Sequence, residues 1–268
     1  MRKYIVLSLM SSVLIFNSCE SEDEIEFVTD PVEQRILLSK VTTVYYDNPA
    51  NPQTVVSNLT YNSQGDLSKI IAEGRTSIFE YDTAGKPSKI NYYNSAGTLE
   101  YYLLYTYANN ELQNTKAIYS NPDFNRTITY TYNNGKVATS TQCQSANCSN
   151  PSLSSYTYNG DNITVETSEI GGTFPSSSKR EYLYDNQLSP FTFTNKYFRI
   201  MMGGAYAMSK NNYASERISY KDSSGNWVQN QQVIYEIQYN SAQLPIQVIG
   251  KTTSGANYVK YNYEYIVQ

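Results

Sequence analysis

A short phrase that recurs along the chain restricts its fold more than any other feature of the sequence. A tyrosine is followed by a few turn residues, often including glycine, and then by an apolar residue that opens the next segment. Such tyrosines follow one another every 25 or 26 residues, and a fixed period of this length is typical of a repeat architecture. Each period has room for two strands and two connections. The regularly spaced tyrosines are Tyr81, Tyr107, Tyr132, Tyr158 and Tyr184.

Between the turn residues, apolar and polar side chains alternate with a period of two. Ile128, Tyr130 and Tyr132 share one side of an expected strand, and the intervening threonines share the other. A period of two with one aromatic face and one polar face indicates an antiparallel sheet with one face in water. Two further sets alternate in this way: Val233, Tyr235, Ile237 and Tyr239, and Tyr261, Tyr263 and Tyr265.

The connections carry the residues that tight turns require. Asn134–Gly135 and Asn159–Gly160 are predicted to form two-residue type I′ turns, because asparagine and glycine tolerate positive φ. The chain holds 28 tyrosines, and tyrosine favours strands. The segment Met201–Met208 interrupts the rhythm, and we expect a long loop or a sheet bend there. The sequence therefore predicts an all-β fold over residues 34–268, an antiparallel meander of repeated β-hairpins that forms either a curved open sheet or a partly closed barrel-like sheet.

One copy of the phrase resembles a known repeat. Its pattern, Tyr-Asp-x-x-Gly, resembles the YD repeat of large bacterial RHS-type proteins and of smaller lipoproteins of Gram-negative bacteria. The other copies, over roughly residues 55–268, have asparagine in place of aspartate or a displaced glycine. The resemblance implies a curling sheet of hairpins and implies no activity. The closest copy is Tyr81-Asp82-Thr83-Ala84-Gly85-Lys86-Pro87.

The N-terminus has the features of a secretory signal. A basic start precedes a mostly apolar stretch that ends at Phe16 and is shorter than the ~20 apolar residues of a membrane-spanning helix. The residues that follow, Phe16-Asn17-Ser18-Cys19, resemble a bacterial lipobox. The resemblance implies that residues 1–18 are removed and that Cys19 is acylated, which would anchor the protein to a membrane.

An acidic run follows from Glu20 to Glu26. Such a run is usually a solvated tether, and we expect residues 19–33 to act as one. The run also resembles the signal with which some Gram-negative bacteria export lipoproteins to the outer face of the outer membrane. We therefore expect an outer-membrane lipoprotein exposed at the cell surface, with a periplasm-facing position as the alternative. Asp82-Thr83-Ala84 resembles an O-glycosylation acceptor of such lipoproteins, with Thr83 as the modified residue.

The remaining cysteines and the absence of histidine limit the possible chemistry. Cys143 and Cys148 lie in a polar, loop-like segment of an exported chain, and we predict a disulfide between them. The chain has no histidine, which excludes Ser-His-Asp and Cys-His catalysis and His-ligated metals. No phosphate-loop or dinucleotide motif occurs, and we expect no cofactor and no metal. The net charge of −4, without a basic cluster, argues against nucleic-acid binding.

Aromatic side chains are the candidates for ligand binding. Most tyrosines follow the strand period, and we assign them to the core face of the sheet. Tyr92, Tyr102 and Tyr206 lie off that period, and Trp227 follows a turn, where a lone tryptophan more often packs at a corner. These four residues are the predicted platform for stacking on sugar rings.

Three functions remain open at this point. The first is a non-enzymatic, lipid-anchored envelope protein that acts as a surface binding or accessory module for a glycan or an outer-membrane protein partner. The second is a structural scaffold lipoprotein of the outer membrane. The third is a glycosidase, which needs only two carboxylates at the right separation. No local motif marks such a pair, so we expect no enzymatic activity and interpret the following acids as solvated strand residues: Glu166, Glu169, Glu181 and Glu236.

Overall fold

The computed structural model describes residues 35–145 and 147–268. The predicted signal segment, the lipidation site at Cys19 and the acidic tether lie outside the described residues. Within the described part, sixteen strands and three short helical segments follow one another along the chain. They are β1 (Ile36–Tyr45), β2 (Gln53–Tyr61), β3 (Leu67–Ala72), β4 (Arg75–Tyr81), β5 (Pro87–Tyr93), β6 (Leu99–Ala108), β7 (Glu111–Tyr119), the 3-10 helix Pro122–Phe124, β8 (Arg126–Asn133), β9 (Lys136–Cys143), β10 (Ser152–Asn159), β11 (Asn162–Ile170), β12 (Ser176–Leu188), α1 (Lys196–Met202), α2 (Gly204–Met208), β13 (Asn211–Lys221), β14 (Trp227–Tyr239), β15 (Pro245–Thr252) and β16 (Asn257–Val267).

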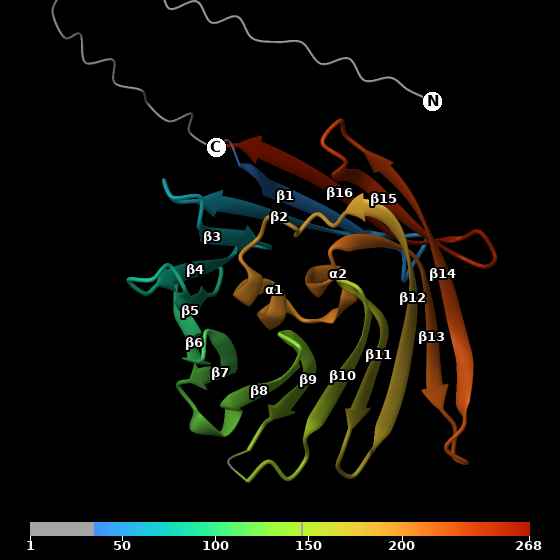
Figure 1. Ribbon diagram of the computed structural model, residues 1–268, viewed down its shortest axis with the longest axis horizontal. Coiled ribbons are helices and arrows are strands. Elements are labelled where there is room, and N and C mark those ends of the chain that lie inside the picture. Colours follow the sequence, from blue (N-terminus) through green and yellow to red (C-terminus); the bar gives the residue numbers. More distant parts are fainter. Residues whose placement is uncertain (1–34, 146) are drawn as a thin grey trace, which may run out of the picture. The chain divides into compact units, whose positions relative to one another are not determined.

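The strands form one closed antiparallel barrel in which each strand pairs with its neighbours in the chain (Figure 1). The last strand, β16, pairs with β1 from Ile36 opposite Val267 to Tyr45 opposite Val259 and so closes the ring. The predicted fold class, an antiparallel meander of hairpins, is confirmed. Of the two shapes left open by the sequence, the structure has the closed one, and closure is complete because both edges of the meander are paired.

The alternation of side chains separates the interior of the barrel from its outer wall. Tyr130 is buried, Ile128 and Tyr132 pack against the same core cluster, and the threonine side chains between them lie on the opposite face. Val233, Tyr235 and Ile237 belong to a second interior cluster with Tyr261 and Tyr263. The predicted strand faces are therefore confirmed, and the aromatic face points into the barrel.

Five of the hairpin loops share one hydrogen-bond pattern. In the loop between β4 and β5, Asp82 Oδ1 accepts hydrogen bonds from the backbone N–H groups of Ala84 and Lys86, both at 2.9 Å, and Gly85 adopts a φ of +73°. Only the side-chain oxygen takes part, so an asparagine serves equally well. The same pattern starts at Asn62, Asn94, Asp222 and Asn240.

Of the two predicted two-residue turns, one lies where the sequence predicts it and the other is shifted along the chain. Asn134 and Gly135 both adopt positive φ, as a type I′ turn requires. In the next hairpin Asn159 pairs with Asn162, so that Gly160 and Asp161 form the turn. The prediction of Asn159–Gly160 as the central pair was wrong by one residue, because the strand pairing continues through Asn159 and glycine takes the first turn position.

The tyrosine of the repeated phrase joins neighbouring hairpins. Tyr107 donates a hydrogen bond to the carbonyl of Pro87 at 2.6 Å, and Tyr132 donates to the carbonyl of Leu112 at 2.8 Å. In each case the acceptor is the first or second residue of a strand in the preceding hairpin. Further bonds of this kind run from Tyr61 to Leu38, Tyr81 to Leu67, Tyr184 to Ile163 and Tyr265 to Pro245. The phrase therefore ties one end of the barrel together, hairpin by hairpin.

The long connection between β12 and β13 enters the barrel, and we name residues 189–210 the plug. Figure 1 shows α1 and α2 inside the ring of strands. Gly203 and Gly204 adopt φ of +70° and +71°, a region that favours glycine, and turn the chain between the two helices. The expected long loop or sheet bend at Met201–Met208 was wrong, because these residues pack as helices against the interior. Neither helix is long and apolar enough to span a bilayer within the described part of the chain.

The plug completes the core of the barrel. Phe198 is 1% exposed and lies edge-on to Phe79 at 4.8 Å and to Tyr81 at 6.0 Å between ring centroids. The Tyr197 hydroxyl donates to the carbonyl of Asn110 at 2.9 Å, which ties the plug to the turn between β6 and β7. The interior faces of the N-terminal strands therefore bury their apolar surface against the plug rather than against one another.

We predict that Tyr107→Phe lowers the free energy of unfolding by about 1–2 kcal/mol, because the carbonyl of the buried Pro87 loses its hydroxyl partner. Urea unfolding of the purified barrel measures the change. Tyr102→Phe is the matched control, because the Tyr102 hydroxyl makes no hydrogen bond to the described residues. Equal effects of the two substitutions would contradict the role assigned to the tyrosine of the repeat.

Candidate functional site

A cavity of about 280 Å³ lies between the plug and the wall formed by β8 to β11. The wall contributes polar groups at successive inward positions, among them Ser140, Ser154 and Tyr156. The plug contributes Met201, Met202 and Tyr206 on the other side of the cavity. A concave space with adaptable apolar side chains on one side and a few converging polar groups on the other is the usual form of a small-molecule site.

Glu166 on β11 is the carboxylate that lines this cavity. Its Oε2 atom accepts a hydrogen bond from the Tyr182 hydroxyl at 3.2 Å. Burial raises the pKa of the Glu166 carboxyl above its ordinary value, although the Tyr182 hydroxyl, Arg180 and the backbone N–H of Ala205 oppose this shift. A Cβ atom at position 204 would make an ordinary contact with Glu166 Oε2 at 3.6 Å, so the φ of +71° rather than lack of space favours glycine there. Glu166, for which a solvated strand position was the simpler expectation, is a partly buried residue that lines the cavity.

An ion pair lies beside Glu166 on the next two strands. Arg180, directly opposite Glu166 in the sheet, donates to Glu216 Oε1 at 2.7 Å. The second oxygen of Glu216 accepts from the Tyr235 hydroxyl at 2.9 Å. Burial by itself lowers the pKa of Arg180, but the combined effect of Glu216, Tyr182 and Glu166 is larger, so the pKa of Arg180 is raised. Both oxygens of Glu216 are thus occupied, whereas Glu166 lines the cavity.

A glycine allows Tyr235 to reach this ion pair. A Cβ atom at position 250 would lie only 2.9 Å from the Tyr235 ring, so the ring passes over β15 where no side chain is present. Because the Tyr235 ring occupies this space, its hydroxyl meets Glu216 in the interior. Glu216 and Arg180 are therefore held together by residues of the wall strands β12 to β14.

Tyr130 lines the cavity, but its hydroxyl is buried beneath the cavity surface. The residue is 4% exposed, and its hydroxyl has no hydrogen-bond partner of normal geometry among the described residues. Burial raises the pKa of Tyr130 to about 12, with the nearby Thr115 hydroxyl opposing the shift. A buried hydroxyl without a hydrogen-bond partner of normal geometry costs free energy.

The four aromatic residues predicted to form a sugar platform do not come together. Tyr206 is the one that lines the cavity, on α2. Tyr92 stacks on Tyr101 at 4.3 Å inside the barrel, and Tyr102 lies on the outer wall with the Lys89 amine 4.9 Å from its ring centroid. Trp227 begins β14, with the amines of two lysines over its ring: Lys179 at 5.5 Å and Lys221 at 5.1 Å.

The other acids taken as solvated do lie on the outer wall. Glu169, Glu181 and Glu236 each pair with a basic side chain there. Sequence reasoning did not single out Arg180 or Glu216, although both occupy inward positions of a period-two strand. A charged residue on the aromatic face of a strand is the signal that would have found them. Within the described residues, no group of three His, Cys, Asp or Glu side chains is arranged to hold a metal ion.

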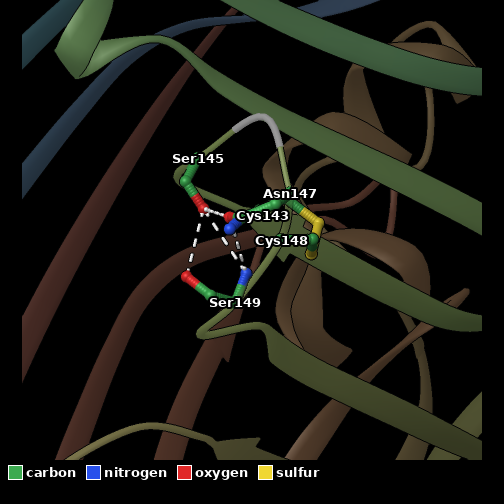
Figure 2. Close-up of a disulfide and its surroundings, with 5 residues drawn as sticks. All are labelled: Cys143, Ser145, Asn147, Cys148 and Ser149. Atoms are coloured by element: carbon green, nitrogen blue, oxygen red, sulfur yellow. Dashed lines mark hydrogen bonds between the residues drawn. A yellow bond between two sulfur atoms is a disulfide. The ribbon is translucent and has the colours of Figure 1, made fainter.

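The remaining predicted sites lie in loops. Figure 2 shows Cys143 and Cys148 joined by a disulfide, with Cα atoms 4.8 Å apart, in the connection between β9 and β10. Ser145 donates to Asn147 Oδ1 at 2.8 Å across the same loop. Thr83 is exposed in the turn between β4 and β5, where an attached group would meet solvent.

Comparison with known proteins supports the fold. No protein-family model matches the sequence, and no curated protein matches it. A porin-like protein from Bacteroides uniformis ATCC 8492 is similar in structure, with a TM-score of 0.54 and 14% identity over 86% of this chain and 96% of that one. A porin-like protein from Bacteroides vulgatus ATCC 8482 has a TM-score of 0.59 and 10% identity over 87% of this chain and 99% of that one. At these identities the likeness concerns the barrel fold alone.

We predict that Glu166→Gln stabilises the barrel progressively as the pH rises from 4.5 to neutrality. The folded state raises the pKa of Glu166 above its ordinary 4.5, so the wild-type protein loses stability as this carboxyl ionises across the range. A tenfold change in the acid dissociation constant corresponds to about 1.4 kcal/mol of stability. Urea unfolding of both proteins at several pH values measures the difference. Glu236→Gln, on the outer wall, is the control, and a difference independent of pH would contradict the prediction.

Proposed function

We propose that this chain is a non-enzymatic, lipid-anchored protein of the bacterial envelope whose barrel binds a small polar ligand, such as a sugar unit. The observation that carries the proposal is the cavity between plug and wall, where the Glu166 carboxyl and Tyr156 line the same space as two serines. The serines beside them add donors and acceptors that suit hydroxyl groups. The sequence suggested aromatic stacking as the mode of sugar binding, whereas hydrogen bonding in the interior is the mode proposed here.

The outer wall supports a barrel that is surrounded by water. A barrel whose wall contacts lipid carries an apolar band between girdles of aromatic residues. Here the aromatic face points inward, and ion pairs occupy the outer face at mid-strand. Isolated apolar side chains such as Ile234 lie among polar neighbours, Ser215 and Lys251 in this case. The outer pairs include Lys40–Glu264 at 2.8 Å, Arg217–Glu181 at 2.9 Å and Lys251–Glu236 at 2.6 Å. We therefore propose attachment through lipidated Cys19 rather than insertion of the barrel.

Solute binding fits this barrel better than solute passage. Both similar structures are described as porin-like, and a barrel of this size without a filling segment encloses an aqueous channel. In this chain the buried side chains of Phe198 and Tyr197 occupy that space and are fixed to the wall. A glycosidase is disfavoured, since Glu216, the second interior acid, has both oxygens engaged by Arg180 and Tyr235.

A calorimetric screen of residues 20–268 against mono- and oligosaccharides tests the binding site. For a sugar that binds, Ser154→Leu is expected to weaken affinity at least about tenfold, because the leucine side chain fills space that the ligand needs. Ser155→Leu is the matched control, since its side chain points to the opposite face of the same strand. Equal affinity of both variants would place the ligand elsewhere, and no binding across the panel would remove sugars as the ligand class.

Anchoring is tested separately in the bacterial host. Cys19→Ser is expected to move the protein from the membrane fraction to the soluble fraction and to abolish labelling by a radioactive fatty acid, because each buried acyl CH₂ contributes ~0.8 kcal/mol to membrane binding. The double variant Cys143→Ser, Cys148→Ser is the control and is expected to stay in the membrane fraction. Membrane association of Cys19→Ser equal to that of the wild type would contradict the anchor.

A further inference from the structure

A second and larger pocket, of about 440 Å³, lies at the end of the barrel where the plug enters. It is bounded by the turns at Gly135 and Asp161 and by plug residues on either side of the helices. Four basic side chains and one carboxylate line it: Lys136, Lys196, Arg199, Lys210 and Asp161. This balance contrasts with the acidic cavity around Glu166 and with the net negative charge of the chain.

The single carboxylate of the pocket neutralises one of the four cations. Lys136 donates to Asp161 Oδ1 at 2.9 Å, and this hydrogen bond and the lysine charge lower the pKa of Asp161. Lys196, Lys210 and Arg199 have no carboxylate oxygen within 4.0 Å of their charged nitrogens in the part of the chain that the structure describes. Three positive charges thus converge on one pocket without a matching anion.

Arg199 is the fixed element of this arrangement. Its Nε donates to the carbonyl of Ala207 at 2.6 Å, and its Nη2 donates to the carbonyls of Met208 and Ser209 at 3.0 and 2.8 Å. These bonds hold the guanidinium in one orientation and leave Nη1 without a partner among the described residues. Burial lowers the pKa of Arg199, as expected for a cation withdrawn from water without a counter-charge.

We propose that this pocket binds the phosphate group of a small organic phosphate. Arg199 provides a planar guanidinium, and Lys196 and Lys210 provide flexible ammonium groups. Proteins use both kinds of hydrogen-bond donor to bind phosphate. The pocket is larger than a phosphate ion needs, and Tyr158, Ile200 and Met208 supply an apolar part for the organic portion of the ligand. A free phosphate ester and the phosphate of a lipid headgroup share this chemistry.

The proposal is tested by calorimetry of residues 20–268 with inorganic phosphate, a hexose phosphate and the unphosphorylated hexose. We expect the hexose phosphate to bind, and the unphosphorylated hexose to bind at least about tenfold more weakly in this pocket. Added salt is expected to weaken the phosphate-dependent part of the affinity. The double variant Lys196→Gln, Lys210→Gln is expected to reduce affinity for the hexose phosphate at least about tenfold. Both lysines are at the surface, and thermal unfolding verifies that the variant is folded.

The control is the double variant Lys69→Gln, Lys116→Gln, which changes the net charge equally on the outer wall. Equal loss of binding in both double variants would overturn the proposal, since it would reflect overall charge rather than the pocket. Vesicles of phosphatidylglycerol and of phosphatidylcholine form the second arm. Pocket-dependent binding to the anionic vesicles without binding to the hexose phosphate assigns the phosphate to a lipid headgroup. No pocket-dependent binding to any of these probes overturns the proposal.

Discussion

A closed ring of sixteen strands encloses more space than its own inward side chains fill, and the rest of this structure follows from that constraint. The inward faces are apolar and aromatic, so an empty interior would leave them in water. Tyrosine, the largest common strand residue here, fills part of the space. The plug fills much of the remainder, with Phe198 among the rings of Phe79, Tyr81 and Tyr105. The barrel and the plug therefore stabilise each other.

The plug also divides the interior into two chemically different spaces. On one side it faces Glu166, with the Arg180–Glu216 pair on the adjoining strands. On the other side it carries Arg199 and two lysines toward the turn end of the barrel. Arg199 both stabilises the plug and lines the basic pocket. Its guanidinium donates hydrogen bonds to carbonyls at the end of α2 and at the residue that follows α2. A segment that completes the core thus also shapes both candidate ligand sites.

The repeat explains why a degenerate sequence still forms a regular fold. The loop that begins with Asp82 and the loops that begin with asparagine have the same hydrogen bonds, because a single oxygen accepts in each.

The candidate sites were harder to predict from the sequence. Arg180 and Glu216 are separated by 36 residues and meet through the register of β12 and β13, for which the sequence carries no local signal. The four aromatic residues of the predicted platform do not come together, because Tyr92 faces the interior, Tyr102 and Trp227 lie on the outer wall, and Tyr206 belongs to the plug.

The sequence by itself determined the strands, their inward and outward faces and most of the turns, because these depend on neighbours within one hairpin. It also determined that the tyrosines form the core face. Only the tertiary structure decided that β1 pairs with β16, as in the contact of Lys40 with Glu264 across 224 residues, and that residues 189–210 turn into the barrel. Both depend on contacts between distant segments, whose free energy comes from burying the interior as a whole and leaves no pattern in any short stretch of chain.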